Sequence, residues 1–113
     1  MREKAGKNDL VPGTLEMLIL KTLSRGASHG YAIAQSIRLA SDDVLRVEEG
    51  SLYPALQRLE LKGWVESEWG HTDTNRRARF YRLTTAGRNR LGVEVDTFER
   101  MIAAIARVLQ TND

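Results

Sequence analysis

Residues 51–60 read SLYPALQRLE, and this stretch decides the fold. Its leucines are spaced four and then three residues apart, at Leu52, Leu56 and Leu59. That spacing predicts a helix with one apolar face turned toward a core. Proline is tolerated in the first turn of a helix, so Pro54 predicts a helix start within about one residue of Ser51. We expect the helix to end near Lys62, just before Gly63.

The outward side of the same helix carries side chains suited to contacting DNA: Ser51, Tyr53, Pro54, Gln57 and Arg58. An α-helix fits the major groove of B-DNA, where glutamine pairs well with adenine and arginine with guanine. Gln57 and Arg58 are therefore candidates for reading bases. Ser51 and the free N–H groups at the helix start can hold a phosphate. Tyr53 can donate to a phosphate or lie against a base edge, and core packing is the alternative for it.

A β-hairpin rich in arginine is expected directly after this helix. Residues 64–69 and 78–83 read as strands, and the polar residues 71–75 read as the loop between them. From position 75 to position 90 the chain has six arginines and no acid. Such a surface suits DNA, because neutralising phosphates releases condensed counterions. The expected DNA contacts of the hairpin are Arg76, Arg77 and Arg79. A solvated hairpin is the alternative.

The last helix is expected to begin at Thr84 or Thr85 and to reach about Leu109. Its apolar residues follow the spacing of a coiled-coil seam, and Met101 widens the apolar face. The seam consists of Leu91, Val95, Phe98, Ile102, Ile105 and Leu109. A helix of about 37 Å is longer than a small domain is wide, so part of its apolar face would be exposed to solvent in a monomer. We therefore predict a homodimer whose interface includes the seam and Met101. A helix that folds back on its own domain is the alternative.

Arg88 and Arg90 lie in the first turns of this helix, where the helix dipole disfavours cations. They call for an anion nearby, either a phosphate or a carboxylate of a partner.

Two shorter helices are expected upstream, at residues 14–25 and 30–41. Thr14 is the expected N-cap of the first helix, and Gly26 is expected to end it. The second helix is expected to bury Ile33, Ile37 and Ala40. The pattern as a whole predicts a mainly helical fold with a small β-hairpin. Three segments are expected: a flexible arm at 1–12, a winged helix-turn-helix at 13–83, and a C-terminal dimerisation helix at 84–113.

Length and composition narrow the class of protein. A chain of 113 residues suits one compact domain, and the net charge of +2 does not by itself indicate nucleic-acid binding. The sequence has no cysteine, which excludes disulfides and thiolate metal sites. The first residues lack the apolar core of a signal peptide, and the longest apolar stretch is far shorter than a membrane span. We expect a soluble cytoplasmic protein with no membrane partner, no metal and no cofactor.

Two rival functions have little support in the sequence. His29 and His71 are far apart, and neither has a serine and an acid nearby in a convincing arrangement, so an enzyme is not expected. The acidic pairs at 42–43 and 48–49 show no metal-ligand spacing. A winged helix that binds protein instead of DNA should lack a positive recognition face. The arginine-rich hairpin argues against that second rival.

Four segments of the sequence resemble the PadR family of bacterial transcriptional regulators. They read PGTLEMLILKTLSRG, HGYAIAQSI, EEGSLYPALQRLELKGWV and RRARFYRLTTAGR, and the resemblance extends over about residues 10–92. It implies a winged helix-turn-helix with a dimerising C-terminal helix, as in the small subclass of the family. It also implies repression by occupying operator DNA, relieved by a small molecule or another signal.

The resemblance carries over to particular positions. Ser51, Tyr53, Pro54 and Gln57 match the recognition helix of the family, and Arg77 and Arg79 match its wing. Some relatives hold flat aromatic ligands at the dimer interface. In this chain the last helix offers Phe98 and Met101 at that place, which makes a small aromatic effector a hypothesis.

Overall fold

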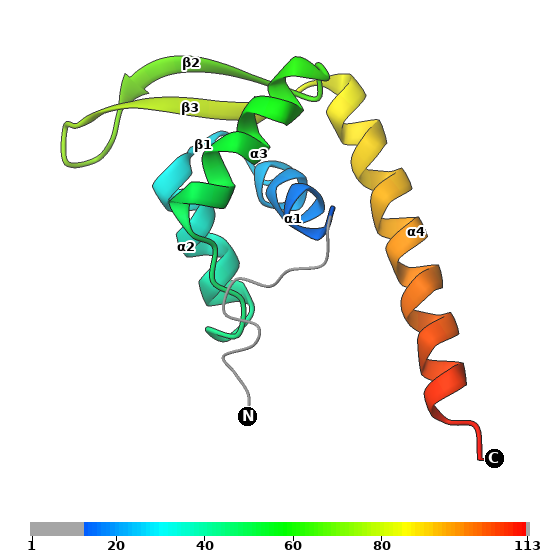
Figure 1. The fold of residues 1–113 in the computed structure, drawn as a ribbon. Coiled ribbons are helices and arrows are strands. Elements are labelled where there is room, and N and C mark those ends of the chain that lie inside the picture. Colours follow the sequence, from blue (N-terminus) through cyan, green and yellow to red (C-terminus); the bar gives the residue numbers. More distant parts are fainter. Residues whose placement is uncertain (1–12, 113) are drawn as a thin grey trace.

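The computed structural model describes residues 13–112 as four helices and three strands (Figure 1). In chain order they are α1 (Thr14–Leu23), β1 (Ser28–His29), α2 (Gly30–Ala40), α3 (Glu49–Leu61), β2 (Val65–His71), β3 (Arg77–Leu83) and α4 (Thr85–Leu109). The predicted fold class is confirmed: the chain is mainly helical, with a winged helix followed by one long helix. The arm predicted at 1–12 lies outside the described residues.

The core lies where α1, α2 and α3 meet the base of the sheet. The three leucines predicted to face inward from α3 are buried completely or almost so, as are Ile33 and most of Ile37 from α2. Ala40 is exposed, so the prediction that it belongs to the inner face is wrong. It is the last residue of α2, beyond the part of that helix that packs on its neighbours.

Two predicted helix starts are also wrong. The N-cap of α1 is Gly13, whose φ of 87° favours glycine, and not Thr14. The start of α3 is Glu49, so Pro54 lies in the second turn. Pro54 cannot donate to the carbonyl of Gly50, four residues earlier. Gly50 is exposed, so water can satisfy that carbonyl and the helix tolerates the proline.

The hairpin forms part of a three-stranded antiparallel sheet with the order β1-β3-β2. The sequence predicted a turn and a helix cap at residues 28–30, and β1 forms there in addition, with Ser28 opposite Tyr81. His29 also caps α2, since the N–H of Ala32 donates to its Nδ1 over 3.4 Å. Two residues are too few for a periodic pattern, and their pairing depends on a strand more than fifty positions away.

Helix α4 begins and ends as predicted. The hydroxyl of Thr84 accepts from the N–H of Gly87 over 3.0 Å and donates to the carbonyl of Gly63 over 2.7 Å, which ties the helix start to the end of α3. Toward its C-terminal end the helix stands clear of the rest of the molecule (Figure 1). The radius of gyration is 15.8 Å, against about 13 Å for a compact chain of this length. No helix among residues 13–112 is long and apolar enough to cross a membrane.

Candidate nucleic-acid interface

The outward face of α3 carries the polar side chains that the sequence predicted, together with the exposed Leu61. All five predicted DNA contacts on this helix are exposed: Ser51, Tyr53, Pro54, Gln57 and Arg58. At 100° per residue, Pro54 and Gln57 lie directly opposite the buried side of the helix. Tyr53 lies on one flank, and Ser51 and Arg58 lie on the other. Pro54 and Gln57 therefore lie at the centre of the exposed face of α3, and the residues along its two edges differ.

Arg58 is held on the α1 side of this face. Its Nε lies 2.7 Å from Oε2 of Glu16, and Nζ of Lys62 lies 3.7 Å from the other oxygen of the same carboxylate. The side chain of Glu16 is largely buried, whereas that of Arg58 is about half exposed. This ion pair is a feature that sequence reasoning missed, because its partners are 42 positions apart. Arg58 thus has a structural partner, whereas no such partner holds Gln57 among residues 13–112.

Tyr53 lies on the wing side of α3, against the start of α2. A Cβ atom added to Gly30 would lie 2.5 Å from the hydroxyl of Tyr53, so the absence of a side chain at Gly30 makes room for this ring. Tyr53 remains 44% exposed, so the ring is not part of the core. The edge of the ring is therefore accessible beside the wing.

The wing is formed by β2, β3 and the turn between them, and it places the predicted arginines unequally. Side chains alternate between the two faces of a strand, so Arg77 and Arg79 share the inner face with Trp69, which is paired with Arg79. The guanidinium carbon of Arg77 lies 4.2 Å from the centre of the Trp69 ring, and that of Arg79 lies 5.2 Å from it. Arg76 lies in the turn.

The arginine-rich segment has acidic neighbours that the sequence did not indicate. Arg82, on the outer face, pairs with Glu66 over 3.0 Å and approaches Glu68 at 4.0 Å. In α4, Nε of Arg90 lies 2.8 Å from Oε2 of Glu94. A carboxylate of the same helix thus lies beside Arg90, whereas the sequence suggested a phosphate or a carboxylate of a partner. Within residues 13–112, no carboxylate forms an ion pair with Arg76, Arg77, Arg79 or Arg88.

The base of the wing is connected to α3 through polar side chains. Nε of Arg79 donates to the hydroxyl of Ser67 over 2.9 Å, and that hydroxyl donates to Oε2 of Glu60 over 2.8 Å. Tyr81 lies nearby, and burial raises the pKa of its hydroxyl above its usual range. These contacts join the wing and α3 into one polar surface.

A concave surface of about 960 Å³ lies between the wing and the helices. It brings together Tyr53 from α3, Trp69 from β2, the arginines Arg76, Arg77 and Arg79, and the start of α2. Ser51, Pro54, Gln57 and Arg58 lie outside it. The predicted DNA contacts therefore form two adjoining parts, the concave wing side and the outer face of α3.

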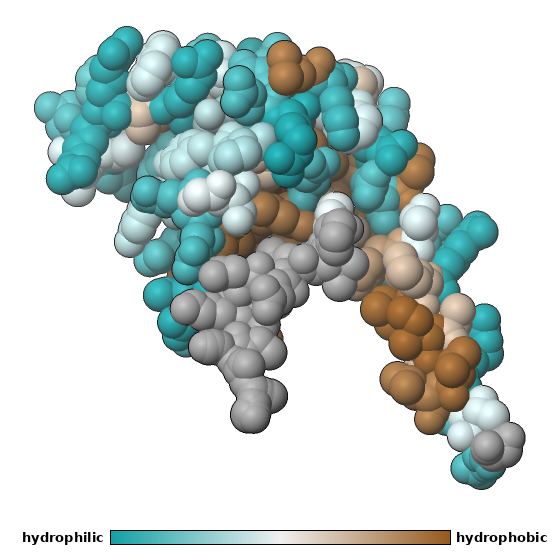
Figure 2. Space-filling model, viewed as in Figure 1, coloured by the Kyte–Doolittle hydropathy of each residue, from teal (hydrophilic) through white to brown (hydrophobic). Residues whose placement is uncertain are grey.

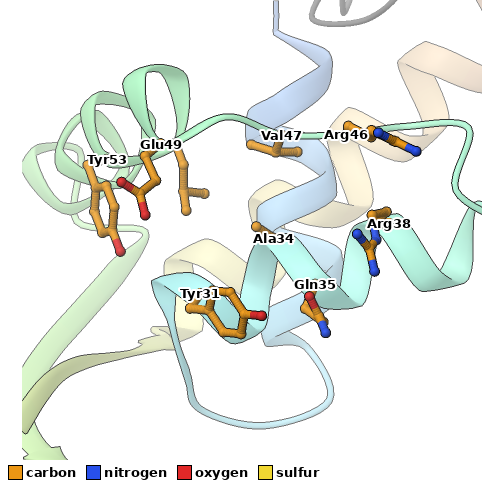
Figure 3. Close-up of a pocket in the computed structure, with 9 residues that line it drawn as sticks. Tyr31, Ala34, Gln35, Arg38, Arg46, Val47, Glu49 and Tyr53 are labelled. Carbon is orange, nitrogen blue, oxygen red and sulfur yellow. The ribbon is translucent and has the colours of Figure 1, made fainter. Parts of the chain in front are cut away.

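A smaller pocket of about 280 Å³ lies between α2 and the start of α3 (Figure 3). Its polar rim includes Arg38 and Arg46, and both of these arginines reach the carboxylate of Asp43. The hydrogen bond from Arg46 holds the pKa of Asp43 below its usual range. The carboxylate of Asp43 is therefore engaged by arginines, and among residues 13–112 no group of three acidic or histidine side chains converges on a metal site.

Helix α4 carries an apolar face that the rest of the chain covers only near its start. Leu91, Val95 and Phe98 are partly buried, whereas Met101, Ile102, Ile105 and Leu109 are exposed. Figure 2 shows hydrophobic side chains gathered along the far half of α4, on the side toward the body of the molecule. An exposed apolar stripe of this kind usually marks an interface.

Comparison with known proteins identifies the family. The model of the PadR-like family of transcriptional regulators matches residues 19–93. A transcriptional regulator from Clostridium thermocellum is 32% identical, with a TM-score of 0.76, over 84% of this chain and 89% of that one. A PadR family transcriptional regulator from Eggerthella lenta is 32% identical, with a TM-score of 0.74, over 88% and 85%. A 37.1 kDa protein from a Streptomyces fradiae transposon is 40% identical, over 76% of this chain but only 23% of that protein. The chain belongs to the PadR-like family of transcriptional regulators.

Proposed function

We propose that this regulator is a homodimeric repressor that binds operator DNA through α3 and the wing. One observation carries the proposal: the polar outer face of α3 adjoins a wing face whose arginines have no carboxylate partner among residues 13–112. Such a surface combines side chains for reading bases with cations for holding phosphates, and a specific DNA-binding protein needs both.

In this arrangement α3 enters the major groove and presents Gln57 and Pro54 to the bases. Gln57 reads an adenine through a bidentate pair, and Pro54 offers apolar contact to a thymine methyl group. Ser51 and Arg58 lie on the side of α1 and Tyr53 on the side of the wing, where each contacts the flanking backbone. Arg76, Arg77 and Arg79 hold the phosphates beside the groove.

The dimer forms through α4, whose exposed apolar residues pack against a second copy. The proposed interface consists of Leu91, Val95, Phe98, Met101, Ile102, Ile105 and Leu109. A two-fold dimer places two copies of α3 on one face of a duplex, so the operator is expected to be roughly palindromic. Its half-sites are expected about 34 Å apart, or a multiple of that distance.

We further propose that an effector relieves repression. A small aromatic molecule that contacts Phe98 and Met101 at the dimer interface would change how the two copies are spaced. The test is a thermal-shift screen of aromatic compounds, followed by operator binding with each compound that binds. A compound that raises the unfolding temperature and weakens operator binding supports this part. A screen without any such compound contradicts it.

The test of DNA binding itself is selection of bound fragments from the source genome, followed by titration against a random duplex at several salt concentrations. A repressor of this design should enrich a palindromic sequence. It should also lose affinity for random duplex steeply, by about 0.9 log units per log unit of salt for each phosphate neutralised. Fragments without a common sequence, or affinity independent of salt, would favour a winged helix that binds protein.

A further inference from the structure

The wing exposes a tryptophan that the DNA-binding residues above do not explain. Trp69 is 53% exposed and lies on the inner face of β2, away from the core. Its ring is within cation–π distance of both Arg77 and Arg79, at 4.2 and 5.2 Å. The ring of Trp69 is large, apolar and exposed to water, and its described contacts are the guanidinium groups of these two arginines.

The two arginines are attached differently. Arg79 faces Trp69 directly across the strand pair, and its Nε is also bound to Ser67, which is bound in turn to Glu60 of α3. Arg77 lies two pairs further out, opposite His71, and its described contact is the ring of Trp69. Arg79 is therefore anchored to the recognition helix, whereas Arg77 depends on the ring.

Stacking on a ring leaves the N–H edges of a guanidinium available. When a ring contacts the flat face of a guanidinium group, the N–H donors lie in the plane of the group and can still bind a phosphate. Stacking also limits the rotamers of a long side chain before DNA arrives, so less conformational entropy is lost on binding. The outer face differs, because Glu66 and Glu68 neutralise Arg82 there.

We propose that Trp69 is a positioning residue that holds Arg77 and Arg79 as a preset pair of phosphate contacts, at a distance from α3 fixed by Ser67 and Glu60. This inference rests on the proposed DNA-binding function. It assigns to Trp69 a role in the affinity for the DNA backbone, not in reading the base sequence.

The test compares Trp69→Leu with Trp69→Phe in the full-length protein. Binding to a random duplex is measured by fluorescence anisotropy over a range of salt concentrations. Trp69→Leu removes the ring and is expected to weaken binding about three- to tenfold and to lower the salt slope by about one to two, since each lost phosphate contact removes about 0.9. Trp69→Phe keeps a ring and is expected to retain most of the affinity and slope. The unfolding temperature of both variants should match the parent, because the ring is half exposed.

The same substitution is then made in the Arg77→Ala/Arg79→Ala double variant. If the ring acts through the arginines, Trp69→Leu causes no further loss there. An unchanged salt slope in Trp69→Leu, or an equal loss with and without the arginines, overturns the inference and leaves the DNA-binding function standing. A parent protein that does not bind duplex at all refutes the proposed function, and the inference falls with it.

Discussion

At the scale of single residues, two glycines of α4 differ in what surrounds them. A Cβ atom added to Gly87 would overlap the carbonyl oxygen of Trp64, which belongs to the backbone and cannot move aside cheaply. A Cβ atom added to Gly92 would meet nothing within 4 Å. We expect Gly87→Ala to lower the free energy of unfolding by about 3 kcal/mol or more. Gly92→Ala, its matched control, should raise it by up to about 1 kcal/mol, because alanine favours a helix.

Chemical denaturation at one fixed protein concentration measures both effects, since dimerisation would otherwise shift the midpoint. Equal stability of the two variants would show that the start of α4 is not packed against the end of α3 in the way described.

The ion pair between Arg58 and Glu16 changes what is expected of the two candidate base-reading residues. Gln57→Ala should cost about 1–3 kcal/mol at the cognate operator and reduce the preference for one base. Arg58→Ala should cost less than about 1 kcal/mol, because the guanidinium is already engaged by a carboxylate. Operator titrations with every base substituted at each position measure both. A larger loss of specificity in Arg58→Ala than in Gln57→Ala would contradict this order.

At the scale of elements, the sequence predicts best where one local pattern determines the outcome. The bounds of α4 follow from Thr84 as a cap and from an apolar repeat that continues to Leu109. The inner leucines of α3 follow from their spacing alone. The start of α3 does not follow from a local pattern. The free-energy cost of Pro54 inside the helix depends on whether water can reach the carbonyl of Gly50. Strand β1 and the pairing of Arg82 with Glu66 could not be predicted from the sequence either, because both depend on a strand register that only the folded chain defines.

The two faces of the wing allow a direct test of which one binds DNA. Arg77 and Arg82 lie on the same strand, but Arg77 is stacked on Trp69 whereas Arg82 is paired with two glutamates. We expect Arg77→Ala to weaken binding to all duplexes similarly and to lower the salt slope by about 0.9. Arg82→Ala removes the same charge from the chain and should leave the slope nearly unchanged. Equal slopes for the two variants would indicate that the wing acts only through net charge.

At the scale of the whole molecule, one copy has a single helix proposed to read DNA, and an α4 that extends well beyond its body. The exposed half of α4 carries apolar residues on the same side as the partly buried Leu91 and Phe98. A continuous face of this kind, covered at one end and bare at the other, is suited to a second copy that covers the remainder. In the proposed dimer, affinity for a palindromic site would depend on α4 as much as on α3, since two half-sites bind together only if the copies stay joined.

The dimer can be tested with one substitution placed on opposite sides of α4. Ile102 and Val93 are 47% and 53% exposed, and their separation of nine positions places their side chains on opposite sides of the helix. Ile102→Glu would bury a charge in the proposed interface, so we expect dissociation into monomers and at least a tenfold loss of operator affinity. Val93→Glu adds the same charge on the other side and should leave both unchanged. Analytical ultracentrifugation and operator titration measure the two outcomes. A tight dimer in Ile102→Glu, or dissociation in Val93→Glu, would show that the copies associate through some other surface.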